Sequence, residues 1–507
     1  MPQMNIVPLA KKVDIACCSL ALVAVVIFLI WMTLPIVADG LSSADDAIVA
    51  HAAKSLAVGK GYGWARTPDD FSPFDPGAIS TGPTMILPLA LLIKVFGPVD
   101  QMPGTVTLVM FLTQLAVASV LLFRRFGWAP TLGFFSVFLW LLMLASANHW
   151  FFGVFIGEAV SFGFVLLGLI SIAEPGRDRW LVAAGLSLAL AFLTKEIALF
   201  AIAGVVASWV IVNASYRETR ARLLRRAAIL IGAGLALPIL FEAVKLFTLG
   251  VSGYRKLLEQ TSQSRATLSV GSGNLAERSA LFWKFFSQSY LSPGLFMGLM
   301  IGYLIVLGWC WRKQVKSWQY TKLFSLFTWA AVGVYFLYIL LVAPLWPRYF
   351  WIGIALMLTA ISAPILQVGS GLRLALLTAI FISTVALGLH RQPLATRFWA
   401  SHSPVPAERA AVVKVLDDHP DLPYAGQFWQ CIFDILFLRR DEGVWAYEPN
   451  VEKLRGQVFI AIMNNVFSAK NSSFVKSVES TCEPLTPDAK VIAAYRCGTP
   501  FWSTYRF

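Results

Sequence analysis

Long apolar segments recur along this chain of 507 residues, and they constrain its fold more than any other feature. A helix of about 20 apolar residues spans a bilayer, and inside lipid only helices and closed barrels satisfy their own backbone groups. The segments that reach or approach this length cover about residues 16–37, 83–97, 105–123, 129–147, 154–173, 180–194, 196–212, 227–249, 293–311, 323–342, 349–367 and 372–390. They predict a polytopic α-helical membrane protein.

Composition excludes two other classes of protein. Hydrophobic residues make up 57% of the chain and charged residues only 14%, whereas soluble domains have about a quarter charged. The 18 Trp, 13 Tyr and 37 Phe exclude a disordered chain, because such chains carry few aromatic residues. The net charge of +13 is explained by cytoplasmic loops and anionic membrane lipids, so no nucleic-acid partner is expected.

The distribution of basic residues predicts the topology. Lys11 and Lys12 precede the first apolar segment, which lacks a small-residue cleavage site and is therefore expected to be retained, with a cytoplasmic N-terminus. The basic loops 216–226 and 312–322 are also expected in the cytoplasm. Keeping Arg124 and Arg125 there requires segment 83–97 not to cross fully. We therefore predict 11 to 13 transmembrane helices, with 83–97 either re-entrant or interfacial, or with one further crossing.

The distribution of apolar segments predicts two domains. Residues 1–390 are expected to form a transmembrane domain that includes an amphipathic first external loop, 39–82. Residues 391–507 lack a spanning segment and are expected to form a small soluble α/β domain on the external side, with strands near 458–463 and 491–495 and a helix at 405–418. Cys482 and Cys497 are placed to form a disulfide if that compartment is oxidising.

Two adjacent carboxylates, Asp45 and Asp46, follow directly after the first apolar segment. A carboxylate at the membrane edge is a functional-site hypothesis by default, and it can act as a general base toward a hydroxyl. The alternative is structural, because the two Asp and the preceding Ser42 and Ser43 suit the N-terminus of an apolar helix. The residues of this segment by themselves fit both a catalytic base and a helix N-terminus.

Three segments of this region resemble a known superfamily: residues 45–63 (DDAIVAHAAKSLAVGKGYG), 80–83 (STGP) and 87–97 (LPLALLIKVFG). They resemble the first loop of GT-C-fold glycosyltransferases, which include protein O-mannosyltransferases, aminoarabinose transferases and mycobacterial arabinosyltransferases. The resemblance implies that Asp45 or Asp46 is the catalytic base and that the donor is a sugar on a polyprenyl phosphate. Many relatives carry Lys-Pro-Pro where this chain has Thr81-Gly82-Pro83, so other residues must supply a positive charge to the donor phosphate.

Lys195 and Arg348, followed by Tyr349, are the candidates for binding that phosphate, because they are predicted at external ends of spans. Their alternatives are a snorkelling Lys195 paired with Glu196, and an interfacial anchor formed by Arg348 beside Trp346 and Tyr349.

A second acidic or substrate-binding site is expected around Glu158, with Glu196, His51 and Thr81 as further candidates; helix-terminus chemistry is the alternative for Glu158. His51 and His149 lack the spacing of a metal site, so no metal ligand is assigned, and a divalent ion is left open as cofactor. The basic segment 250–290 is interpreted as a surface helix, or alternatively as a loop over the active site.

These features predict an inverting glycosyltransferase of the bacterial inner membrane, with its active site and C-terminal domain facing the periplasm. Its partners are a polyprenyl-phosphate sugar, membrane lipids, and an acceptor hydroxyl on an envelope glycan, lipid or protein. The alternatives are a transporter or flippase for polyprenyl-linked lipid or sugar, and a non-catalytic scaffold of envelope assembly. Neither the sugar nor the acceptor is encoded in a recognisable motif.

Overall fold

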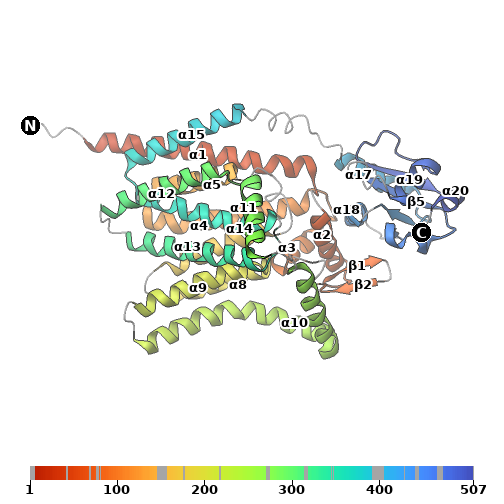
Figure 1. The fold of residues 1–507 in the computed structure, drawn as a ribbon, viewed down its shortest axis with the longest axis horizontal. Coiled ribbons are helices and arrows are strands. Elements are labelled where there is room, and N and C mark those ends of the chain that lie inside the picture. Colours follow the sequence, from red (N-terminus) through yellow and green to blue (C-terminus); the bar gives the residue numbers. More distant parts are fainter. Residues whose placement is uncertain are drawn as a thin grey trace, which may run out of the picture. The chain divides into compact units, whose positions relative to one another are not determined.

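The structure is a computed structural model (Figure 1). It describes residues 6–41, 44–67, 70–75, 79, 81–145, 157–174, 177–215, 219–269, 274–312, 318–343, 345, 347–390, 405–427, 429–439, 445–464 and 472–505. The chain forms two compact units. The bundle unit comprises Met1–Thr33, Leu108–Phe152 and Gly157–Gln392, and the loop–sheet unit comprises Leu34–Thr107, Gly153–Ile156 and Pro393–Phe507.

Apolar helices make up the bundle unit, and most of them run roughly parallel in Figure 1. Helices α1 (Ile6–Asp39) and α4 (Met102–Phe126) each continue from one unit into the other. The remaining elements of the bundle unit are α5 (Trp128–Ala145), α7 (Glu158–Ile172), α8 (Asp178–Thr194), α9 (Ala198–Ser215), α10 (Arg220–Ser269), α11 (Leu275–Ser289), α12 (Pro293–Arg312), α13 (Trp318–Leu341), α14 (Pro347–Ser362), the 3₁₀ helix η1 (Ala363–Gln367) and α15 (Ser370–His390).

Six helices among the described residues are long and apolar enough to cross a membrane. The number becomes seven if Leu275–Ser289 and Pro293–Gly308, which meet at 85°, form one broken span. Shorter apolar helices cover Pro83–Phe96, Trp128–Met143, Glu158–Ile172 and Ser370–Ala379. The polytopic helical architecture is thus confirmed, while the number of crossings stays a prediction.

The core of the bundle unit is built around α14. In its spanning segment Arg348–Gln367, 89% of the most apolar window is buried, against 6% in Arg220–Gln263 of α10. Large aromatic side chains fill the space beside α14: Phe162 stacks on Phe138 at 5.5 Å between centroids and meets Trp351 edge to face at 5.8 Å. Helix α14 is therefore central, and α10 exposes its apolar surface, as a helix facing lipid does.

The loop–sheet unit contains the first external loop. Helix α2 (Ala44–Ala57) is followed by an antiparallel hairpin of β1 (Gly63–Thr67) and β2 (Asp70–Pro73), and then by α3 (Pro83–Phe96). With 14 residues, α3 is about 21 Å long, shorter than the ~30 Å hydrocarbon core. Helix α3 lies wholly within this unit, and whether it crosses the membrane stays a prediction.

The C-terminal part of the loop–sheet unit is a small mixed sheet with the strand order β4-β3-β5-β7-β6. Strand β3 pairs in parallel with β4 and β5, whereas β7 is antiparallel to β5 and β6. The elements are α17 (Val405–Asp418), β3 (Tyr424–Gly426), α18 (Trp429–Leu438), β4 (Trp445–Tyr447), the 3₁₀ helix η2 (Glu448–Leu454), β5 (Phe459–Asn464), α19 (Ser473–Thr481), β6 (Glu483–Pro484), β7 (Ile492–Cys497) and α20 (Thr499–Thr504). The predicted α/β character is confirmed.

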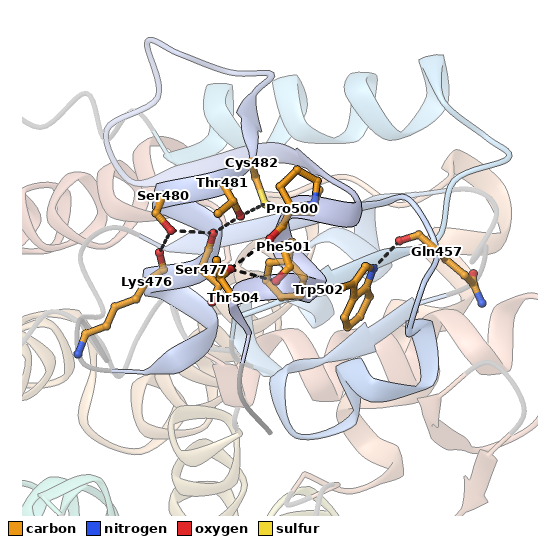
Figure 2. Close-up of a disulfide and its surroundings, with 11 residues drawn as sticks. Gln457, Lys476, Ser477, Ser480, Thr481, Cys482, Pro500, Phe501, Trp502 and Thr504 are labelled. Atoms are coloured by element: carbon orange, nitrogen blue, oxygen red, sulfur yellow. Dashed lines mark hydrogen bonds between the residues drawn. A yellow bond between two sulfur atoms is a disulfide. The ribbon is translucent and has the colours of Figure 1, made fainter.

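A disulfide links Cys482 to Cys497, as the sequence predicted, and joins the end of α19 to the end of β7 (Figure 2). The indole of Trp502 donates to the carbonyl of Gln457 at 2.8 Å nearby. The core of this sheet is closed by aromatic contacts, such as Phe459 with Phe501 at 5.1 Å. The side chain of Cys431 lies outside the described part of the chain.

The described parts of the segment 250–290 are almost entirely helical, in α10 up to Ser269 and in α11 from Leu275 to Ser289. The second part of α10 begins after a kink at Gly250, whose φ of 66° lies in the left-handed region that suits glycine, and α11 follows. Arg255 is exposed and pairs with Glu259 at 3.4 Å one turn later. The surface-helix interpretation therefore describes this segment better than an irregular loop.

Candidate active site

Asp46 occupies the first turn of α2, in the loop–sheet unit. Alanine-rich helices form readily, and Ala47, Ala50 and Ala53 are fully buried where α2 packs against its neighbours. Asp46 is only 1% exposed. Burying a carboxylate is costly, and a helix N-terminus offsets part of that cost through its backbone dipoles. The side chain of Asp45, the other candidate base, lies outside the described part of the chain.

His51 and Thr81 are also buried in this unit, at 0% and 1% exposure. Burial, together with the positive charges of Lys54 and Lys60, lowers the pKa of His51 from 6.5 to about 3. The imidazole is therefore neutral at pH 7. Among the residues that the structure describes, no group of three His, Cys, Asp or Glu side chains is arranged to hold a metal ion. His149 lies outside them.

In the bundle unit, Glu158 and Lys195 form a buried ion pair. Gly157 precedes α7 with a φ of 88°, and Glu158 is the first residue of that helix. Lys195 follows the last residue of α8. Its ammonium lies 3.4 Å from the Glu158 carboxylate, and the two side chains are 5% and 1% exposed. Glu196, the partner that local sequence suggested for Lys195, is exposed.

Aromatic hydroxyls and a second cation belong to the same unit. Tyr335 of α13 donates its hydroxyl to the backbone carbonyl of Tyr349 at 2.8 Å. The guanidinium of Arg348 lies over the ring of Tyr349, 5.2 Å from its centroid. The first of these contacts links α13 to the start of α14.

The structure thus groups the predicted site residues into two sets. Asp46, His51 and Thr81 belong to the loop–sheet unit, whereas Glu158, Lys195, Arg348 and Tyr349 belong to the bundle unit. The first set offers a buried carboxylate near the end of a span. The second offers an acid, two cations and phenolic hydroxyls, which are groups that bind phosphate or hydroxyl substrates.

Sequence reasoning missed a buried arginine in the basic segment. Arg278 of α11 donates to the carbonyls of Leu340 and Ala343 at 2.7 Å each, and to that of Ile339 at 3.3 Å. These carbonyls end α13, where a cation is favoured by unsatisfied acceptors and the helix dipole. Arg278 therefore fixes the end of α13 shortly before Arg348. The position of Arg278 in the sequence of α11 does not indicate that its side chain binds these carbonyls.

Three further buried charged residues in the loop–sheet unit were not predicted. The ammonium of Lys54 donates to the carbonyls of Leu436 and Arg439 at the end of α18. One guanidinium nitrogen of Arg409 donates to both carboxylate oxygens of Asp100 at 2.9 Å each. A lysine among the apolar residues in the second half of α2 was the available signal for Lys54, but it does not identify a partner so distant in sequence.

Comparison with known proteins identifies the fold. No protein-family model matches the chain, and no curated protein matches it in sequence. Among solved structures, ArnT from Cupriavidus metallidurans bound to undecaprenyl phosphate is similar, with a TM-score of 0.56 and 12% identity over 94% of this chain and 97% of ArnT. The apo state of ArnT gives a TM-score of 0.54 at 13% identity, over 96% and 98% of the two chains.

The chain has the GT-C fold. This confirms the superfamily resemblance drawn from residues 39–97 at the level of fold. A third structure, the oligosaccharyltransferase of Archaeoglobus fulgidus with Zn and sulfate, has a TM-score of 0.44 at 10% identity over 96% of this chain and 76% of that one, which is too low to show a shared fold.

Proposed function

We propose that this chain is a membrane glycosyltransferase that moves a sugar from a polyprenyl-phosphate donor to an acceptor hydroxyl. The observation that carries the proposal is the buried carboxylate of Asp46, placed in the first turn of α2 directly after the first long apolar helix of a GT-C fold. ArnT, which shares this fold, was solved with undecaprenyl phosphate, a lipid of the proposed donor class.

In the proposed reaction, Asp46 or Asp45 takes the proton of the acceptor hydroxyl. The hydroxyl oxygen attacks the anomeric carbon of the donor sugar from the face opposite the phosphate. A new glycosidic bond forms as the bond from the anomeric carbon to the phosphate oxygen breaks, and the configuration inverts. Polyprenyl phosphate leaves with the bonding electron pair, and the proton stays on the carboxyl group until solvent removes it.

Cationic groups must stabilise the leaving phosphate as its charge develops. The ammonium of Lys195 lies 3.4 Å from the Glu158 carboxylate and offers a point charge. Arg348 carries a planar guanidinium, whose geometry can bind two phosphate oxygens at once. For that geometric reason we assign the larger share of phosphate binding to Arg348, with Tyr349 beside it, and a shared site for acceptor or phosphate to the Glu158–Lys195 pair.

The proposed location is a bacterial inner membrane, with residues 1–390 as the catalytic domain and residues 391–507 as a periplasmic domain. The Cys482–Cys497 disulfide supports an oxidising compartment for the second part. Acceptors consistent with this location are an envelope glycan, lipid or protein.

The test is release of polyprenyl phosphate from radiolabelled polyprenyl-phosphate sugars in proteoliposomes. Wild type is compared with the Asp45→Asn, Asp46→Asn double variant and with Asp70→Asn, an exposed acid of the same loop, as matched control. We expect donor-selective release by wild type and Asp70→Asn, and a loss of at least about 100-fold in the double variant. Equal release by the double variant, folded as wild type, would refute a carboxylate base in α2.

One observation favours a transporter as the second candidate: the Glu158–Lys195 pair is a buried ionisable pair between the start of α7 and the end of α8, of the kind that relays protons or binds a coupling ion. In that case wild type would move the labelled lipid between leaflets without breaking its phosphate–sugar bond. The proteoliposome assay distinguishes the two outcomes, because only transfer releases free polyprenyl phosphate.

A further inference from the structure

We propose that Asp100 and Arg409 form a positioning pair that holds the turn between α1 and α2, and with it the start of α2 that carries the candidate base. The proposal rests on the proposed function only for the catalytic role of Asp46. Neither Asp100 nor Arg409 is expected to touch the substrate, so both act through the turn that they hold.

The contacts form a closed network around Leu41, and all of them lie within the loop–sheet unit. Both terminal oxygens of Asp100 accept from one guanidinium nitrogen of Arg409 at 2.9 Å. The other guanidinium nitrogen donates to the carbonyl of Leu41 at 2.5 Å, and the backbone amide of Leu41 donates to Asp100 at 3.1 Å. The donor and the acceptor of Leu41 are thus both held by this ion pair.

Burial makes the network strong. The side chains of Arg409 and Asp100 are 5% and 10% exposed, and Leu41 is 2% exposed. Hydrogen bonds that involve charged groups are stronger than neutral ones, and they gain further strength away from water. Arginine suits this position because its fork can contact a carboxylate and a carbonyl together, which a lysine cannot do with the same geometry.

Gly40, the residue before Leu41, packs closely against Asp100 of the same ion pair. Gly40 has a φ of 59°, and a Cβ added there would lie 2.5 Å from the Cγ of Asp100. Only glycine permits both the left-handed conformation and this close approach. The chain therefore turns against Asp100 at Gly40, shortly before α2 begins at Ala44.

A second contact, independent of the Asp100–Arg409 pair, holds the C-terminal end of α2. Lys54 donates to the carbonyls of Leu436 and Arg439 at the end of α18. Arg409 belongs to α17 and Lys54 contacts α18, so the C-terminal part of the chain holds α2 at both ends. The placement of Asp46 is consequently set by residues more than three hundred positions away in the sequence, such as Arg409.

A first experiment tests the positioning without reference to catalysis. Hydrogen exchange is measured on the full-length protein in nanodiscs for wild type, for Arg409→Gln, and for the Asp100→Asn, Arg409→Gln double variant, which leaves no unpaired buried charge. Glu408→Gln is the matched control, because Glu408 is the neighbouring buried charge of α17 and its carboxylate accepts from the backbone amides of Lys490, Val491 and Ile492, where β7 begins. We expect amides at the start of α2 to exchange at least about tenfold faster in both Arg409 variants and within about twofold of wild type in Glu408→Gln.

A second experiment tests the consequence for transfer. A misplaced base slows the chemical step, whereas donor binding depends on other residues, so we expect kcat to fall at least about tenfold with the donor KM changed less than about threefold. The acid limb of the pH–rate profile should keep its midpoint, because the titrating carboxylate is unchanged. Arg409→Lys retains the charge without the fork and should give an intermediate rate.

The outcomes separate the two proposals. If wild type transfers no sugar but the Arg409 variants still loosen α2, the proposed function fails while the pair still holds the turn. Unchanged exchange in α2 of the double variant overturns the positioning pair, whatever the activity. Faster exchange with unchanged kcat also overturns it as a determinant of catalysis. A shifted pH midpoint would mean that Arg409 acts on the titration of the base rather than on its position.

Discussion

Lys195 illustrates what a single residue reveals before its neighbours are known. Its position at the end of a span indicated a functional or interfacial cation, and local sequence offered Glu196 as partner. In the structure its ammonium lies 3.4 Å from the carboxylate of Glu158, with both of these side chains buried, while Glu196 is exposed. A lysine buried at the end of α8 needs a buried anion, and Glu158 at the start of the neighbouring helix α7 supplies it.

Removing Lys195 should therefore be far more costly than removing Glu196. In Lys195→Met, Glu158 would keep a buried charge without its partner, and we expect a loss of about 3–5 kcal/mol in the free energy of unfolding. Glu196→Gln should change it by no more than about 0.5 kcal/mol. Denaturation in mixed detergent micelles measures both. Adding Glu158→Gln to Lys195→Met should recover most of the loss, and failure to recover it would argue against the pair as the cause.

His51 predicts a pH dependence of stability. Its pKa is about 3 in the folded protein, against an ordinary value of 6.5. Between these values the unfolded chain binds a proton that the folded protein does not, so acidification favours unfolding. The contribution of neutral His51 to the free energy of unfolding should be fully present above about pH 6.5. It should be lost as the pH falls toward 3, by up to about 1.4 kcal/mol per pH unit. Unfolding midpoints measured from pH 7.5 to 4 should fall less steeply in His51→Gln, and parallel slopes would contradict the assignment.

At the scale of elements, sequence patterns predicted local structure well and long-range contacts poorly. The helix expected at 405–418 is α17, and the strands expected near 458–463 and 491–495 are β5 and β7. These elements follow from apolar runs and alternation, which are local signals. The polar part of the contact between α2 and α18 consists of the Lys54 ammonium and two backbone carbonyls, and backbone carbonyls carry no sequence signature.

The α2–α18 contact makes Lys54 a stabilising residue that can be tested directly. Lys54→Met keeps the length and apolar character of the side chain but leaves the carbonyls of Leu436 and Arg439 without this donor. We expect a loss of about 1–3 kcal/mol, localised to α2 and α18. Lys60→Met, at an exposed position just after α2, is the matched control. Limited proteolysis should cut α18 faster in Lys54→Met alone; equal rates in the two variants would show that the contact contributes little.

At the scale of the whole molecule, the fold could be predicted because its two main signals are local in sequence. The apolar spans and the paired carboxylates of the first loop are each formed by consecutive residues. The candidate site could be predicted only in part. Asp46, Glu158, Lys195 and Arg348 stand out as charges near the ends of apolar runs. Arg278, Asp100 and Arg409 do not, because they lie in segments where charged residues are ordinarily solvated and only the tertiary structure buries them.

The two-unit organisation makes a prediction about membrane topology. Helix α4 begins in the loop–sheet unit at Met102, and its 25 residues span about 37 Å, which exceeds the ~30 Å hydrocarbon core. Its last turn carries Arg124 and Arg125, which the positive-inside rule places in the cytoplasm. The first external loop and the C-terminal sheet, which share the loop–sheet unit, should then both lie on the opposite side of the membrane.

Single cysteines at exposed positions test this arrangement in a background in which Cys17, Cys18, Cys310 and Cys431 are replaced by serine. Lys60→Cys in the first loop and Asp488→Cys before β7 should react with a membrane-impermeant maleimide in intact spheroplasts. Arg222→Cys, in the basic first turn of α10, should react only after the membrane is permeabilised. Labelling of Lys60→Cys and Asp488→Cys from different sides would contradict a single loop–sheet unit. Labelling of both only after permeabilisation would keep the unit but reverse its side, and with it the proposed periplasmic active site.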